Sequence, residues 1–168
     1  MPKIIENLEQ RLKDAAGEQV REVGHAAMTI RSVASACGVG VGTVYNYFSS
    51  KDDLLASSMQ DDWIACVASM EEVANSETTA EAVARAVYDG LVDFSRRHDH
   101  IFRDEAAAES FAKSFRIYHG VLRSQLAAPM RRFISDDFGA EFAAESLLTW
   151  TMAHKDFDTI WSQLRKLF

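Results

Sequence analysis

The stretch MTIRSVASACGVGVGTVYNYFSSKDDLL, from Met28 to Leu55, decides the fold of this chain. Thr29 can cap a short helix, because its hydroxyl can accept a hydrogen bond from a free amide of the next turn. The inward residues of that helix recur at helical spacing: Ile30, Val33, Ala34 and Cys37. Gly38 can adopt the left-handed backbone that ends it, and a second short helix over about 41–48 follows. Two short helices joined by a glycine-bearing turn predict a helix-turn-helix.

The second short helix is the one expected to enter a DNA major groove. Val44 and Phe48 lie four residues apart, so both can turn inward and hold this helix against its neighbours. Gly40 and Gly42 leave the start of the helix without side chains, which allows its backbone to approach DNA closely.

Phosphate contacts are expected from a second group of side chains near the same helix. Tyr45 and Tyr47 carry phenol groups that can donate to phosphate oxygens, and the ammonium group of Lys51 can do the same. Ser50 can cap the following helix, which places free backbone amides beside the same phosphates.

The rest of the chain also reads as helical, so the predicted fold class is all-α. Apolar residues recur at spacings of three and four, prolines number two, and β-branched runs are scarce. Helices are expected over about 3–23, from 51 to beyond 73, from 78 to about 94, over 108–135 with a kink at Pro129, and over 141–167.

Composition and charge limit the classes of protein to which this chain can belong. The chain has 168 residues and a net charge of −7, but residues 1–58 carry six Lys or Arg against seven Asp or Glu. The acidity therefore lies mostly outside the helix-turn-helix, although no basic block supports strong non-specific DNA binding. No signal peptide or membrane-spanning run is visible, and Cys37 and Cys66 form no disulfide framework. We expect a soluble, cytoplasmic protein with no membrane partner.

The opening motif resembles the DNA-binding domain of the TetR family of transcriptional repressors. The resemblance covers about residues 5–56. It extends upstream of the helix-turn-helix to paired alanines, an apolar residue and a glycine before the cap. The matching residues are Ala15, Ala16, Val20, Gly24, Thr29, Ile30, Arg31, Val33, Ala34, Gly38, Val39 and the run GTVYNYFSSKDDLL. The resemblance implies an N-terminal three-helix DNA-binding domain over residues 1–50 and a helical ligand-binding and dimerisation domain over residues 51–168.

The resemblance also implies which residues contact DNA. They are Thr29, Arg31, Val41, Gly42, Thr43, Tyr45, Asn46, Tyr47 and Lys51. Gly40 departs from the serine that is common at its position, and Gly42 adds no base contact. The side chains able to read base edges are then Arg31, Val41, Thr43 and Asn46, with arginine preferring guanine and asparagine preferring adenine. The expected DNA partner is a double-stranded, pseudo-palindromic operator.

In this family the last two helices pair with a second subunit, so a homodimer is expected. The candidate interface is the apolar stripe of the last helix: Leu147, Trp150, His154, Phe157, Trp161 and Leu164.

A small apolar ligand is expected to release the repressor from its operator. The candidate pocket residues are Trp63, Met70, Phe94, Phe111, Phe115 and Tyr118. Core packing remains the alternative for every aromatic residue in both sets.

Two further alternatives remain open at this point. The chain could be a helical small-molecule-binding or enzymatic bundle whose helix-turn-helix only packs, or a DNA-binding regulator controlled by a protein partner without a small ligand. No nucleophile–base signature or phosphate-binding glycine loop is visible, so neither an enzyme nor a cofactor is predicted. His98 and His100 lack a cluster of further ligands, so no metal site is predicted.

Overall fold

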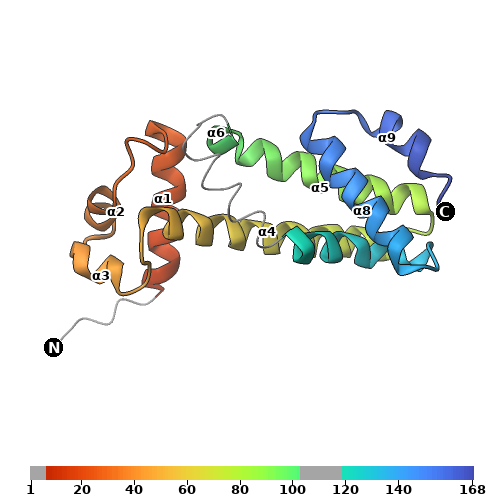
Figure 1. The fold of residues 1–168 in the computed structure, drawn as a ribbon. Coiled ribbons are helices and arrows are strands. Elements are labelled where there is room, and N and C mark those ends of the chain that lie inside the picture. The colour runs from red at the N-terminus through yellow and green to blue at the C-terminus, as the bar shows by residue number, and fades with distance from the viewer. Residues whose placement is uncertain (1–6, 103–118) are drawn as a thin grey trace. The chain divides into compact units, whose positions relative to one another are not determined.

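The computed structural model describes residues 7–102 and 119–168 (Figure 1). These residues form helices and turns, with no strand among them, which confirms the all-α prediction. Contacts divide the chain into two compact units at Asp61. The first unit includes residues 7–61 and 98–102, and the second includes residues 62–97 and 119–168. The functional boundary at residue 50 stays a prediction.

The first unit contains helices α1 (Leu8–Val23), α2 (Ile30–Cys37), α3 (Val41–Tyr45) and α6 (Asp99–Phe102), with the start of α4 (Lys51–Ser76). Its first helix is amphipathic, and its buried residues are Leu8, Leu12, Ala16 and Val20. Val23 is exposed, because it is the last helical residue before the turn at Gly24.

The helix-turn-helix forms as its local signals predict. The Thr29 hydroxyl accepts a hydrogen bond from the Ser32 amide at 3.0 Å, and the Ser32 side chain bonds back to the Thr29 amide. Gly38 ends α2 with a φ of 70°, a left-handed conformation that glycine adopts without steric cost. Val44 is completely buried and Phe48 nearly so, which holds α3 against the unit's core. The α-helix itself ends at Tyr45, earlier than expected, and a turn carries the chain to Phe48.

The second unit contains the rest of α4, helix α5 (Ala80–Arg97), helical residues 119–127, a 3-10 helix η1 (Ala128–Arg132), α8 (Asp137–Met152) and α9 (Phe157–Leu164). Helix α8 packs against α5, and α9 packs against both. The buried face of α5 consists of Val83, Ala84, Val87, Leu91 and Phe94, which confirms the predicted periodicity. Gly90 lets α4 and α5 approach closely, because a Cβ atom there would lie 2.5 Å from Cε of Met70.

The closing helix predicted over 141–167 is wrong, because two helices occupy that range. Helix α8 ends at Met152, and His154 adopts a left-handed φ of 57°. Asp156 then caps α9 by accepting a 2.9 Å hydrogen bond from the Thr159 amide. The apolar spacing continues across the break, so periodicity alone could not reveal it. The preceding helix also changes at the expected point, since the α-helix gives way to the 3-10 helix at Ala128, next to Pro129.

Candidate nucleic-acid interface

The exposed face of α2 and α3 carries most of the residues predicted to touch DNA. Tyr45 and Tyr47 are 54% and 47% exposed, so neither side chain belongs to the core. Asn46 lies between them and is also exposed. Thr29, Arg31 and Gly42 are exposed, while Val41 and Thr43 are half-buried. The structure therefore brings these residues to the surface around one short, anchored helix.

Two contacts fix α2 against α1 beneath this face. The Ser32 hydroxyl donates to the Gln19 side-chain oxygen at 2.6 Å. The Arg11 guanidinium donates to the carbonyl oxygen of Cys37, whose thiol donates in return to the Arg11 carbonyl at 3.4 Å. Burial raises the pKa of the Cys37 thiol, which favours a packing role over a reactive one.

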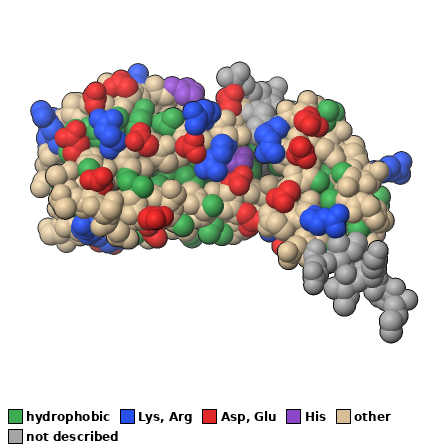
Figure 2. All heavy atoms as spheres, turned by 180° about the vertical axis from the view of Figure 1, so that it is seen from behind, with side chains coloured by type: hydrophobic (Ala, Val, Ile, Leu, Met, Phe, Trp, Pro, Cys, Tyr) green, Lys and Arg blue, Asp and Glu red, His purple; other side chains and the backbone are tan. Residues whose placement is uncertain are grey.

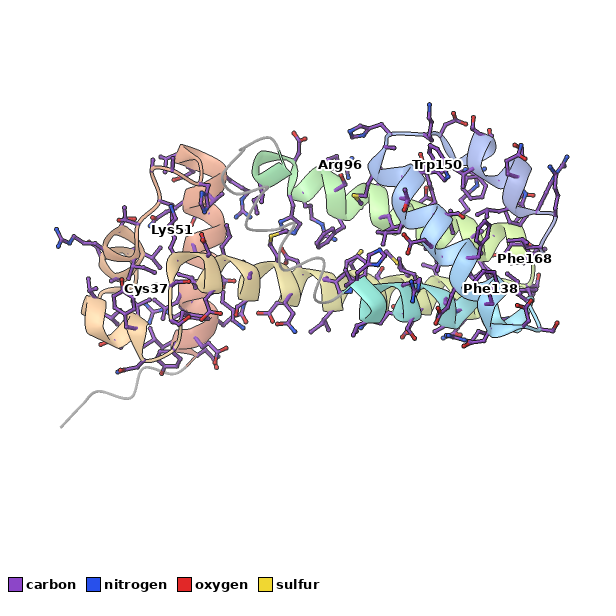
Figure 3. All side chains as sticks on the ribbon, viewed as in Figure 1. Cys37, Lys51, Arg96, Phe138, Trp150 and Phe168 are labelled. Atoms are coloured by element: carbon purple, nitrogen blue, oxygen red, sulfur yellow. The ribbon has the colours of Figure 1, made fainter. Side chains whose placement is uncertain are left out.

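Lys51, which is predicted to contact DNA, makes hydrogen bonds within the protein, and its DNA contact stays a prediction. Its ammonium group donates to the carbonyl oxygens of His25 and Met28, at 2.6 and 3.3 Å, in the turn between α1 and α2. Figure 3 labels Lys51 near this turn. The neighbouring Asp52 carboxylate accepts a 3.0 Å hydrogen bond from Nε2 of His25, which is buried. The side chain of Lys51 is thus half-buried and bound to the protein's own backbone.

Charge is distributed without a large basic block. On the face drawn in Figure 2, basic and acidic side chains are interspersed. This distribution agrees with the near balance of charge in residues 1–58. Affinity for DNA would then rest on a small number of specific contacts more than on a strong positive field.

The predicted pocket residues are only partly within the described part of the chain. Trp63, Met70 and Phe94 are buried in the second unit. The Trp63 ring meets the Phe94 ring edge-on at 5.2 Å, and its Nε1 donates to the Gln125 side-chain oxygen at 2.9 Å. Phe111, Phe115 and Tyr118 lie outside the described residues. Their assignment to a pocket stays a prediction.

A shallow groove between α4 and α5 is a separate feature of the second unit. It encloses about 450 Å³, and Cys66, Met70 and Gly90 contribute to its lining. The Cys66 thiol donates to the Gly90 carbonyl at 3.2 Å, and burial raises its pKa. This thiol therefore acts as a packing group in the described structure.

The predicted dimer residues fall into two groups. Leu147, Phe157 and Leu164 are buried within the second unit, and the half-buried Trp161 ring stacks on Phe157 at 6.0 Å. These four side chains already serve the chain's own core. Trp150 and His154 are exposed.

Sequence reasoning missed Phe138 and Phe142, two exposed apolar residues of α8 that precede the predicted Trp150. Phe138 is 79% exposed, Phe142 is 51% exposed and Trp150 is 50% exposed. Figure 3 labels Phe138 and Trp150 near opposite ends of this helix. Phe138 and Phe142 are four residues apart and share one side of the helix, with ring centroids 6.4 Å apart, and that spacing is the signal that could have found them.

Helical residues 119–127 lie alongside α8 and extend this face. His119 pairs with Glu145 at 3.2 Å, and Arg123 pairs with Glu141 at 3.1 Å. Val121, on the same segment, is 57% exposed. We name four exposed apolar side chains of these two segments the exposed α8 face: Phe138, Phe142, Trp150 and Val121. Two of them, Phe138 and Phe142, lie ring to ring with centroids 6.4 Å apart.

Within residues 7–102 and 119–168, no three His, Cys, Asp or Glu side chains are placed to hold a metal ion together. His98 is buried, and the side chain of His100 is outside the described set. None of the described helices is both long enough and apolar enough to cross a membrane.

The sequence of the first unit matches a known protein family. Residues 12–57 match the family described as bacterial regulatory proteins, tetR family. This match identifies a TetR-family domain within the first unit. A fatty acid metabolism regulator protein of Bacillus subtilis is 34% identical over 68 residues, which cover 40% of this chain and 35% of that protein.

Solved structures extend the TetR-family likeness to the fold of the whole chain. A TetR-family transcriptional regulator from Streptomyces coelicolor is 17% identical, with a TM-score of 0.67 over 96% of this chain and all of that one. FadR from Bacillus subtilis, solved in complex with stearoyl-CoA, is 20% identical. Its TM-score is 0.57, over 92% of this chain and 96% of that one. At these identities the likeness concerns the fold.

Proposed function

We propose that this TetR-family chain is a DNA-binding transcription regulator that acts as a homodimer on a pseudo-palindromic operator. The observation that carries the proposal is the exposure of Tyr45, Asn46 and Tyr47 around a helix whose Val44 is fully buried. A helix that only packed would bury its aromatic residues. Here they remain accessible to phosphates and bases.

The base-reading side chains in this proposal are Arg31, Val41, Thr43 and Asn46. Tyr45, Tyr47 and Thr29 would supply phosphate contacts, and Gly42 would allow the α3 backbone to approach the groove. A single short helix per chain gives too few base contacts to specify a site. A dimer with reading helices about 34 Å apart would double them.

The exposed α8 face supports the homodimer. Phe138, Phe142 and Trp150 are apolar side chains that a soluble monomer would expose to water. A second copy that presented the same face would cover it symmetrically. The interface was predicted on helices over about 108–135 and 141–167, and this proposal assigns it to helical residues 119–127 and α8, without α9.

Release by a small apolar ligand belongs to the proposal as well. FadR, a structure of similar fold, was solved with stearoyl-CoA, which makes long-chain acyl-CoA molecules the first class to test. Trp63 and Phe94 would border the site from α4 and α5. A ligand can release DNA only if it binds the DNA-free conformation more tightly than the DNA-bound one.

Selection of bound sequences from random DNA with the full chain tests the function. The expected result is an enriched pseudo-palindrome bound by two copies of the chain. Enrichment of no sequence at moderate salt would contradict a specific regulator. Addition of acyl-CoA molecules of different lengths to the best complex then tests ligand release separately.

A further inference from the structure

Two consecutive residues at the start of α4 hold the same turn of the chain. Lys51 donates from its ammonium group to the His25 and Met28 carbonyl oxygens, at 2.6 and 3.3 Å. Asp52 accepts from the imidazole of His25 at 3.0 Å. We name these contacts the turn clamp, which consists of Lys51, Asp52, His25 and the Met28 carbonyl.

The turn clamp uses most of the hydrogen-bonding capacity of Lys51. An ammonium group has three donors, and two of them point to backbone carbonyls. While both carbonyl contacts are kept, only the third donor remains for a phosphate. Hydrogen bonds from a charged donor are stronger than neutral ones, so breaking the two carbonyl contacts costs free energy.

The clamped turn leads directly into the reading elements. Thr29, which follows the Met28 carbonyl, caps α2 through Ser32. Arg31 lies in the first turn of that helix and is exposed. The turn clamp therefore fixes where α2 begins relative to α4.

We infer that Lys51 and Asp52 are positioning residues for operator recognition, and that Lys51 acts through the α1–α2 turn and not through a phosphate. This inference rests on the proposed function. It also gives Asp52 a role that favours operator binding, although the negative charge of this residue would by itself repel DNA.

Lys51→Met separates the possible roles, because it keeps the length of the side chain and removes the charge and donors. The full-length variant is compared with wild type on the selected operator and on random-sequence DNA, over a range of salt concentrations. Circular dichroism first establishes a temperature at which both proteins are fully folded.

A positioning role predicts a selective loss. Operator affinity should fall about tenfold or more, the scale of one charge-assisted hydrogen bond. Random-sequence DNA should lose less than about threefold, and the slope of log affinity against log salt should stay nearly constant, because no phosphate contact is removed. A phosphate contact would instead weaken both DNAs alike and reduce the slope by about 0.9. That result, or unchanged affinity for both DNAs, would overturn the inference.

Asp52 provides a second test, because loss of its negative charge and loss of its hydrogen bond to His25 should change operator affinity in opposite directions. Both Asp52→Asn and Asp52→Ala remove one negative charge, but only asparagine keeps an oxygen that can accept from His25. The expected result is weaker operator binding for Asp52→Ala and equal or tighter binding for Asp52→Asn. If both variants bind the operator more tightly, electrostatic repulsion is the whole effect and the turn clamp has no role.

These experiments distinguish two kinds of failure. If the wild-type protein selects no operator, the proposed function fails and the inference fails with it. If the wild type selects an operator but Lys51→Met behaves as a lost phosphate contact, only the inference fails.

Discussion

Some residues in and next to α3 are buried and hold the helix in place, and others are exposed and available to DNA. Val44 is buried and holds the helix, whereas Tyr45 and Asn46, the next two residues, are exposed. Consecutive residues thus divide between side chains that stabilise the domain and side chains available to DNA. Substitutions on the exposed side should affect recognition with little effect on stability.

Asn46→Ala should relax base preference at one position of the operator, at a cost of about 1–3 kcal/mol if the contact to adenine is bidentate. Tyr47→Phe should weaken binding to all sequences alike, because a phosphate contact carries no sequence information. Binding measured against a panel of single-base operator variants distinguishes the two patterns. An Asn46→Ala variant with unchanged preference at every position would show that this residue reads no base.

Gly90→Ala should destabilise the second unit by about 1–3 kcal/mol through overpacking. Its Cβ would lie 2.5 and 2.6 Å from Cε and Cγ of Met70, and Cγ cannot move aside without a change of rotamer. Gly120→Ala is the matched control, because Gly120 is also helical and nothing lies within 4 Å of a Cβ there. The control should be neutral or stabilising by up to about 1 kcal/mol. Urea denaturation measures both, and equal midpoints would contradict the close approach of α4 and α5.

At the scale of elements, the caps decide where helices begin. Asp136 caps α8 by accepting from the Gly139 amide at 2.7 Å, and Asp156 caps α9 through Thr159. The second cap forces a break in a region whose apolar spacing alone would continue one helix. Tyr88 and Arg85 of α5 then hold the region after the break, through the Lys155 carbonyl and Asp158.

The Asp156 cap should make α9 sensitive to acid. Hydrogen bonds from Thr159 lower the pKa of this carboxyl group. Its contribution to stability is therefore present when the carboxylate is ionised, and it is lost as the pH falls through the depressed pKa. Asp156→Asn keeps a good cap and removes the titrating group. Hydrogen exchange of the α9 amides should rise at low pH in the wild type more than in this variant, and identical pH profiles would exclude the carboxylate as the cause.

For the whole molecule, the distribution of apolar surface indicates how the chain assembles. The second unit buries Leu147, Phe157 and Leu164 in its own core and leaves Phe138 and Phe142 exposed. Two acidic side chains of α8, Glu141 and Glu145, pair with Arg123 and His119 of helical residues 119–127. The exposed α8 face is therefore flanked by ion pairs, an arrangement similar to the apolar centre and polar rim of protein interfaces.

Phe142→Glu should convert the protein to monomers and reduce operator affinity, because a buried charge at the centre of the interface lacks a partner. Val73→Glu is a matched control, since Val73 is a helical apolar residue with 45% exposure in the same unit, on α4. Sedimentation at micromolar concentration should show monomers for the first variant and dimers for the control. A dimeric Phe142→Glu protein would place the interface elsewhere.

The sequence by itself determined the local architecture of the first unit. Thr29, Gly38 and Val44 act on residues within a few positions, so the cap, the turn and the inward face of α3 could be predicted from neighbours in the chain. The exposure of Tyr45 follows from the same helical geometry, whereas Tyr47 lies in the turn after α3. The family resemblance rested on this local pattern and was confirmed by the match over residues 12–57.

Only the tertiary structure decided which groups meet across the chain. Lys51 could have pointed to solvent, but the carbonyls of a turn more than twenty residues away accept its hydrogen bonds. Leu147 and Phe142 are both apolar, yet one is buried against neighbouring helices and the other is exposed. Periodicity identifies apolar faces but does not say which face another helix covers, because burial depends on partners distant in sequence. The physical difference is one of range, since caps and turns are set by adjacent residues and packing by the whole fold.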